Sequence, residues 1–169
     1  MTKRVLAEKP KVASKIAGGL GDDETVENRV VKNYRIETDE GELVVSPAVG
    51  HIFNLEDAGD EWECPAFETE WLPIFETDDS AGYVRKYYRN LEDQLEDADE
   101  YVNACDLDLE GSVIGFTVLS FIADAPKDRI KRMKFSTLTS SDLPEAFDDL
   151  DQFAEGMTEA GLAPHVLAF

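Results

Sequence analysis

The 169-residue sequence has few cysteines and histidines, few aromatic side chains and no long hydrophobic run. Its two cysteines, Cys64 and Cys105, are far apart and lack the paired spacing of a zinc or redox motif. The apolar stretch after Met1 is too short for a signal peptide, and no run reaches the roughly 20 residues that span a membrane. We therefore expect an intracellular, cytoplasmic protein without a membrane segment.

Basic residues are also scarce, with 16 Lys and Arg against 37 Asp and Glu and a net charge of -21. Disorder is disfavoured because 43% of the residues are apolar and cluster in strand-like runs between turn signals. An acidic surface on a folded domain is typical of proteins from a salt-rich cytoplasm, and also of domains that bind a basic partner. The scarcity of cations normally argues against nucleic-acid binding.

The order of the predicted elements is that of an α/β domain. Strand patterns occupy residues 3–7, 27–38, 42–49, 100–105 and 130–135, and helical patterns occupy residues 10–20, 83–95, 112–122 and 143–157. Residues 39–41 give a turn signal, and the acidic residues 56–82 favour a loop pinned by aromatic side chains: Trp62, Phe67, Trp71 and Phe75. The pattern predicts a mostly parallel sheet of about four core strands, with helices on both faces and an added β-hairpin and loop insert. Ligands of such sheets bind at the carboxyl ends of the strands.

Two acidic segments follow predicted strands and are expected at that edge. Glu8 comes directly after the first strand, although taken alone it also suits a surface carboxylate near a helix N-terminus. Residues 106–111 read Asp-Leu-Asp-Leu-Glu-Gly, so alternation can aim Asp106, Asp108 and Glu110 the same way, and Gly111 permits a tight turn into a helix. Crowded carboxylates repel one another unless a cation compensates, and an all-oxygen ligand set favours Mg²⁺.

An EF-hand calcium loop also begins with this pattern. With Asp106 as its first position, the twelfth position requires a bidentate Glu, and the sequence has Thr117 there. An apolar strand pattern, rather than a helix, precedes the segment. The sequence therefore excludes an EF-hand.

Glu8 after the first strand and D-x-D-x-E-G after a later one together resemble the two signatures of the Toprim domain, a family of topoisomerases, primases, nucleases and recombination proteins. Three more segments resemble the type IA DNA topoisomerase branch: residues 8–11 its E-S-P-x-K segment, residues 50–55 its G-H-hydrophobic-x-x-L segment and residues 132–139 its R-hydrophobic-x-F-x-x-hydrophobic-T strand. All five occur in the expected order, from residue 3 to about residue 150. The resemblance implies a Rossmann-like Toprim fold from an archaeal type IA topoisomerase, and the charge indicates a halophilic form.

The same resemblance implies roles for particular residues. Asp106 and Asp108 would hold Mg²⁺, Glu110 would complete or orient the site, and Glu8 would carry the proton to or from the leaving hydroxyl. The expected catalytic residues and metal ligands are therefore Glu8, Asp106, Asp108 and Glu110, and the expected contacts to single-stranded DNA are Lys9, Lys11, His51 and Arg132.

Three positions depart from the family pattern. Leu109 stands where many relatives have an Arg, Ser112 stands in place of a second Glu, and Val12 replaces the motif Lys. We expect Lys9 or Lys11 to supply the missing cation.

The nucleophilic tyrosine of type IA enzymes lies in a later domain, and none of the five tyrosines here is in a segment that resembles it. We expect residues 1–158 to form the Toprim domain and residues 159–169 to be a tail leading toward a further domain. On this hypothesis the chain assists DNA cleavage and religation but does not cut DNA alone. Two alternatives stay open: a free-standing Toprim nuclease or RNA-processing enzyme that activates water with the same carboxylates, and a non-enzymatic acidic domain that binds a partner.

Overall fold

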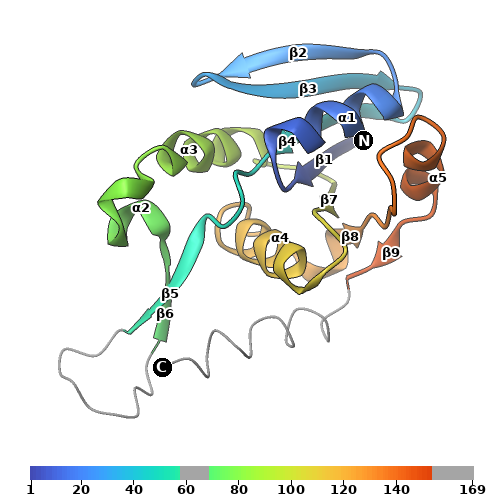
Figure 1. Cartoon of the computed structure of the whole chain (residues 1–169). Coiled ribbons are helices and arrows are strands. Elements are labelled where there is room, and N and C mark those ends of the chain that lie inside the picture. The colour runs from blue at the N-terminus through green and yellow to red at the C-terminus, as the bar shows by residue number, and fades with distance from the viewer. Residues whose placement is uncertain (58–68, 154–169) are drawn as a thin grey trace.

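A computed structural model of the chain describes residues 1–57 and 69–153. Its main sheet runs in the order β2-β3-β4-β1-β7-β8-β9 (Figure 1). The strands of this sheet are β1 (Thr2–Ala7), β2 (Asp23–Asn28), β3 (Val31–Thr38), β4 (Gly41–Pro47), β7 (Glu100–Ala104), β8 (Ile130–Arg132) and β9 (Asp151–Gln152). A separate two-stranded sheet pairs β5 (Phe53–Asp57) with β6 (Thr69–Pro73).

Four parallel strands form the centre of the main sheet. β1 pairs in parallel with β4 on one side and with β7 on the other, and β7 pairs in parallel with β8. This arrangement confirms the expected parallel core of about four strands, which the antiparallel strands β2, β3 and β9 extend at its edges. Because the central strands all end at one edge, the residues that follow them lie near one another.

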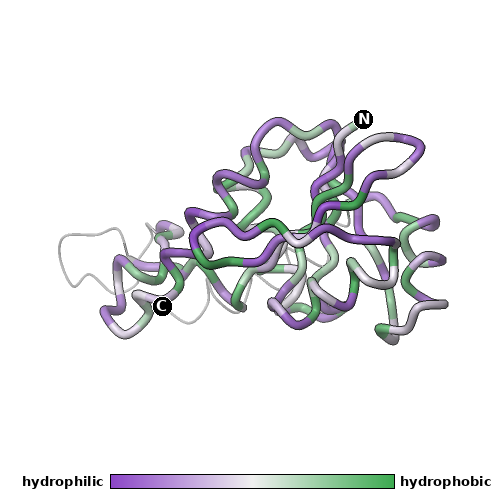
Figure 2. The backbone as a smooth tube through the Cα atoms, turned by 90° about the horizontal axis from the view of Figure 1, so that it is seen from above, coloured by the Kyte–Doolittle hydropathy of each residue, from purple (hydrophilic) through white to green (hydrophobic). Residues whose placement is uncertain are grey.

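Helices cover both faces of this sheet, as expected. The helices are α1 (Pro10–Leu20), α2 (Ile74–Thr77), α3 (Val84–Gln94), α4 (Leu109–Phe121) and α5 (Asp142–Asp148), with 3₁₀ turns η1 (Asp79–Ala81) and η2 (Lys127–Arg129). α1 and α5 pack on one face through Ile16 and Leu143, and α3 and α4 pack on the other through Leu91 and Val118. Hydrophobic and hydrophilic stretches alternate along most of the chain (Figure 2), so many short segments contribute to the two cores.

Several predicted elements are confirmed with their boundaries nearly unchanged. α1 covers the predicted range, and α3 is shorter than its predicted range by one residue at each end. The turn predicted at residues 39–41 joins β3 to β4, where Thr38 pairs with Gly41. Gly41 has a φ of 132°, and a Cβ atom on it would lie 2.0 Å from the carbonyl oxygen of Met1. Both its conformation and its surroundings therefore require glycine at this turn.

The prediction of one strand over residues 27–38 is wrong. The chain forms a hairpin of β2 and β3, with a turn at Arg29 and Val30. Both residues have positive φ angles, 52° and 68°. Asn and Gly are the residues that usually occupy such a turn, so the sequence carries no turn signal at this point.

Other predicted boundaries also need correction. The helix predicted over residues 143–157 ends at Asp148 and is followed by β9, while residues 154–157 lie outside the described part of the chain. The strand predicted over residues 130–135 ends at Arg132. Within the predicted loop 56–82, Trp71 and Phe75 pack against the core as expected, and β6, α2 and η1 give the loop regular structure. Cys64, Trp62 and Phe67 lie outside the described residues.

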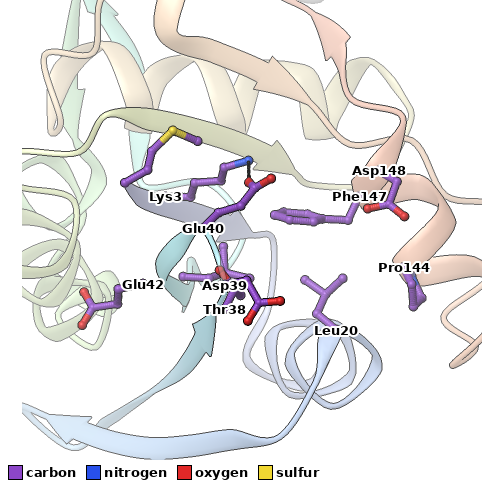
Figure 3. A pocket seen from close by; sticks show the side chains of 11 residues that line it. Lys3, Leu20, Thr38, Asp39, Glu40, Glu42, Pro144, Phe147 and Asp148 are labelled. Atoms are coloured by element: carbon purple, nitrogen blue, oxygen red, sulfur yellow. Dashed lines mark ion pairs between the residues drawn. The ribbon is translucent and has the colours of Figure 1, made fainter.

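A pocket of about 470 Å³ lies at the amino ends of β1 and β4, between α1 and α5 (Figure 3). Lys3, which lines this pocket, is paired with two carboxylates and lies over the ring of Phe147. Its Nζ is 3.6 Å from a Glu40 carboxylate oxygen, 3.3 Å from one of Glu100 and 5.5 Å from the Phe147 ring centroid. The pocket is therefore at the edge of the sheet opposite to the predicted site. Across residues 1–57 and 69–153, no helix is long and apolar enough to cross a membrane.

Candidate functional site

Glu8 lies directly after β1, at the carboxyl edge of the sheet, and is only 3% exposed. One oxygen of its carboxylate, Oε1, is 2.8 Å from Lys9 Nζ. The other oxygen, Oε2, accepts a hydrogen bond from the backbone N–H of Asp106 at 3.3 Å. Its backbone carbonyl accepts from the N–H of Gly50, at 3.0 Å, which holds the segment after β4 beside it. Glu8 therefore joins three of the predicted motifs and is not a solvated surface carboxylate.

The acidic segment 106–110 forms the connection from β7 to α4. Asp108 is the N-cap of α4, and its Oδ1 accepts a hydrogen bond from the N–H of Gly111 at 2.7 Å. Glu110 is in the first helical turn. Two predictions are therefore wrong. The side chains do not alternate through Glu110, and the helix does not begin at Ser112. The side chain of Asp108 caps α4, which begins at Leu109.

The sequence suggested that Gly111 permits a tight turn, but the structure requires glycine there because the backbone of Asp106 lies close to it. A Cβ atom on Gly111 would lie 2.1 Å from the Asp106 carbonyl oxygen, so any side chain would displace the loop. One turn later, a Cβ atom on Gly115 would lie 1.9 Å from the Asn103 side chain. Asn103 is 4% exposed, and its Oδ1 accepts from the N–H of Cys105 at 3.0 Å. α4 thus packs directly on the end of β7 and fixes the position of the Asp106 backbone.

Arg132, at the end of β8, is buried and supports the same loop. Its guanidinium donates to the carbonyl oxygen of Asp106 at 2.6 Å and to that of Asn103 at 3.3 Å. Burial lowers the pKa of this guanidinium below its usual range, and the nearby acidic residues oppose that shift. The hydrogen bonds favour a supporting role, and the DNA contact proposed for Arg132 stays a prediction.

His51 lies beyond the end of β4, opposite the first turn of α4. Its Nε2 is 3.5 Å from Oε1 of Glu110. Lys11 is exposed on the first turn of α1. The structure therefore brings together seven of the eight predicted site residues through direct contacts or chain neighbours, and Lys11 is the one at the periphery.

The charges at this edge are unevenly balanced. The pKa of Asp106 is raised above its ordinary value, first by burial and then by the neighbouring carboxylates Glu8 and Asp108. Lys9 and Arg132 reduce that shift. The pKa of Lys9 is raised in turn, mainly by its hydrogen bond and its ion pair with Glu8. A further cation would relieve the repulsion that remains around Asp106.

The donor atoms suit Mg²⁺, because all are carboxylate oxygens. Within residues 1–57 and 69–153, however, no group of three or more His, Cys, Asp or Glu side chains is placed to hold a metal ion. These side chains have other partners: Glu8 is bonded to Lys9, Asp108 caps α4, and Glu110 is beside His51. The chemistry of the set fits the ion, and binding would require these side chains to exchange partners.

The sequence model of the Toprim domain matches residues 3–138. The chain belongs to the Toprim domain family. DNA topoisomerase 1 of Aeropyrum pernix is 43% identical over 162 residues, and DNA topoisomerase 1 of Methanocaldococcus jannaschii is 37% identical over 169 residues. The matches cover 94% and 99% of this chain but 24% and 22% of those proteins. This Toprim domain therefore spans about a quarter of the length of these relatives.

The Toprim fold is also found in a solved structure, that of full-length topoisomerase I from Thermotoga maritima. Its TM-score to this chain is 0.63 at 20% sequence identity, with 97% of this chain and 23% of that chain covered. The likeness confirms the α/β fold predicted from the sequence.

Sequence reasoning missed Asn103 as a part of the site. A polar residue within the apolar strand pattern of residues 100–105 was the available signal. Cys105 is buried after the same strand, and burial raises the pKa of its thiol far above the usual range. Cys105 is therefore a buried thiol of the hydrophobic core.

Proposed function

We propose that this Toprim domain is the Mg²⁺-binding catalytic module of a type IA DNA topoisomerase, an isomerase, from a salt-adapted archaeon. The contact network that joins Glu8, Lys9 and Asp106 carries the proposal, because it gathers carboxylates at the ligand-binding edge of the sheet. The relatives named DNA topoisomerase 1 support the same function. The substrate is single-stranded DNA, held together with the other domains of the full-length protein.

In this proposal Asp106 and Asp108 hold the ion, and Glu110 and Glu8 complete the set. The bound ion would stabilise the negative charge that develops on the reacting phosphate. A tyrosine hydroxyl from another domain loses its proton to water, its oxygen attacks phosphorus, and the bond from phosphorus to the 3′-oxygen breaks. Glu8 donates a proton to the leaving 3′-oxygen and takes it back when the hydroxyl reverses the reaction.

Lys9 is the better candidate for the cation that Val12 replaces. Its Nζ contacts the carboxylate of Glu8, and the charges of Asp106 and Glu110 act on it as well. Lys9 therefore holds Glu8 in place and adds positive charge where a phosphate would enter. Lys11 and His51 remain predicted DNA contacts.

The net charge of -21 supports a location in a salt-rich cytoplasm. We also propose that the domain comprises residues 1–158, followed by a tail over residues 159–169. The tail lies outside the described residues.

Titration of the chain with Mg²⁺ in molar KCl, with the heat of binding measured by calorimetry, tests the proposed metal site. We expect Asp106→Asn with Asp108→Asn to abolish Mg²⁺ binding, because both proposed ligands lose their charge. The matched control is Asp22→Asn with Asp39→Asn, two exposed residues away from the site that give the same change in charge. Mg²⁺ binding that survives the first pair of substitutions shows the assignment to be wrong.

The two alternative functions predict different results in DNA nicking and in Mg²⁺ binding. Mg²⁺-dependent nicking of plasmid DNA by this chain alone would identify a free-standing nuclease. Absence of Mg²⁺ affinity in the wild type would identify a non-enzymatic partner-binding domain. We expect Mg²⁺ binding without nicking.

A further inference from the structure

The N-terminal half of α3 differs in charge from most of the chain. Residues 80–91 contain no Asp or Glu but include Arg85, Lys86 and Arg89. In a chain with 37 acidic and 16 basic residues, this stretch has a net positive charge. Residues 9–21 and 129–141 are also basic and free of acids, but they adjoin the carboxylate site. The α3 stretch needs a separate explanation.

Aromatic rings are interleaved with these cations. The guanidinium carbon of Arg85 is 5.1 Å from the Phe75 ring centroid, and the Nζ of Lys86 is 5.4 Å from that of Tyr87. Neither cation forms an ion pair among residues 1–57 and 69–153, so both charges remain available to an anion. Cations beside exposed rings are what single-stranded nucleic acids bind, since phosphates pair with cations and bases stack on rings. Phe75 is buried and holds Arg85, so a base needs another ring.

The start of α3 adds to this positive region. Tyr83 is the N-cap residue, is 59% exposed and makes no side-chain capping bond, and the first turn contains no acidic residue. The helix dipole therefore adds partial positive charge beside an exposed ring. An exposed tyrosine ring next to two cations gives a base a surface on which to stack.

This half of α3 is at the same edge of the sheet as the carboxylates. The residues after α3 reach the amino end of β1, where the N–H of Asp99 donates to the Thr2 carbonyl at 3.0 Å, so the helix begins near the carboxyl edge. The segment after β4 links the two regions, because Gly50 is bonded to Glu8 while the Phe53 ring is 5.9 Å from that of Tyr88. Figure 1 shows α3 beside β4, with its N-terminal end next to α2.

We propose that Tyr83, Arg85 and Lys86 form a second contact for single-stranded DNA, outside the carboxylate site. Arg85 and Lys86 bind phosphates, and a base stacks on Tyr83. The surface deepens the proposed function, since it takes the same substrate, but it requires neither Mg²⁺ nor the carboxylates. It would guide the strand toward the edge at which Asp106 lies.

Binding of a fluorescein-labelled oligothymidine, measured by anisotropy in EDTA across a salt series, tests the proposal. We expect Arg85→Gln with Lys86→Gln to weaken binding about tenfold and to reduce the salt slope by about 1.4, since each phosphate contact to a single strand contributes roughly 0.7. Tyr83→Ala should weaken binding about fivefold or more without changing the slope, because it removes stacking.

The control for charge is Lys32→Gln with Lys127→Gln, two exposed cations outside all three basic stretches. Circular dichroism at each salt concentration establishes that every variant is folded. The proposal is overturned if the wild type does not bind, or if the control weakens binding as much as the α3 variant. Equal competition by polyglutamate and by oligothymidine would instead assign the surface to an acidic protein partner.

Photocrosslinking locates the contact without depending on affinity. An oligothymidine containing 5-iododeoxyuridine should crosslink to Tyr83 or Tyr87, as mapped by mass spectrometry, and crosslinks confined to other segments contradict the proposal. The variant Arg85→Gln with Lys86→Gln separates this inference from the proposed function. Its Mg²⁺ affinity should equal that of the wild type, because both residues are outside the carboxylate site. A wild type that does not bind Mg²⁺ would contradict the proposed function, while oligonucleotide binding in EDTA would still test this surface.

Discussion

Replacing Gly111 by alanine would place a methyl group where α4 meets the Asp106 loop. The added Cβ atom would lie 2.1 Å from the carbonyl oxygen of Asp106 and 2.9 Å from its nitrogen. These are backbone atoms, which a change of side-chain rotamer cannot move away. The contact is more than 1 Å shorter than the roughly 3.5 Å at which non-bonded atoms pack, so the loop or the helix must shift.

Helix propensity and packing predict opposite effects of this substitution on the free energy of unfolding. Alanine in a helix is about 0.5–1 kcal/mol more favourable than glycine. Overpacking costs about 1–3 kcal/mol, and displacing the N–H of Gly111 from Asp108 costs about 1 kcal/mol more through the lost cap. We therefore expect Gly111→Ala to lower the free energy of unfolding by about 1–3 kcal/mol and to weaken Mg²⁺ binding, because Asp106 moves with the loop.

Gly18→Ala is the matched control, because Gly18 is exposed on α1 and a Cβ atom there would have no neighbour within 4 Å. It should stabilise the domain by about 0.5–1 kcal/mol. Denaturant unfolding followed by circular dichroism, and Mg²⁺ titration, would be measured for both variants in molar KCl. If Gly111→Ala stabilises the domain as Gly18→Ala does, or leaves Mg²⁺ affinity unchanged, the close packing of α4 on the loop is refuted.

Three further outcomes are expected. Arg132→Met removes hydrogen bonds to the buried carbonyl of Asn103 and the partly buried carbonyl of Asp106, so denaturant unfolding should show a loss of about 2–4 kcal/mol. The exposed Arg129→Met should change little. Two arginines lower the pKa of Glu42, the hydrogen bond from Arg4 being the main cause. Its stabilising effect is therefore present above the ordinary pKa and lost as pH falls through the lowered one, and Glu42→Gln should remove this pH dependence from the unfolding free energy. Raising KCl from about 0.1 to 1 M should raise the melting temperature, because the Debye length falls from roughly 10 Å to 3 Å; an unchanged temperature would contradict salt adaptation.

The parallel core was predictable because its strands and helices follow strong hydrophobic periods. The order of Glu8 and the segment 106–111 along the chain was also sufficient to predict that they meet, since each follows a parallel strand. Arg132 was predicted inside a strand over residues 130–135 and is instead the last residue of β8. Asn103, by contrast, was read only as part of an apolar strand. Its contribution depends on how closely α4 approaches β7, which no local pattern encodes.

The errors arose where side-chain contacts override local patterns. The β2–β3 hairpin turns at Arg29 and Val30, which lack turn chemistry, while Arg29 forms an ion pair with Asp93 of α3 at 3.0 Å. α4 starts earlier than its apolar period indicated because the side chain of Asp108 caps it. In neither case can hydrophobic periodicity alone locate the boundary.

Net charge and local charge have different consequences for the DNA binding that we propose for this domain. A net charge of -21 repels a polyanion at long range, but in molar salt the screening length of roughly 3 Å leaves only charges in near contact effective. Lys9 beside Glu8, and Arg85 and Lys86 on α3, then determine what a phosphate meets. The same screening weakens each phosphate contact, whereas stacking does not depend on charge. A salt-adapted domain should therefore depend on exposed rings such as Tyr83 more than a relative from dilute cytoplasm does.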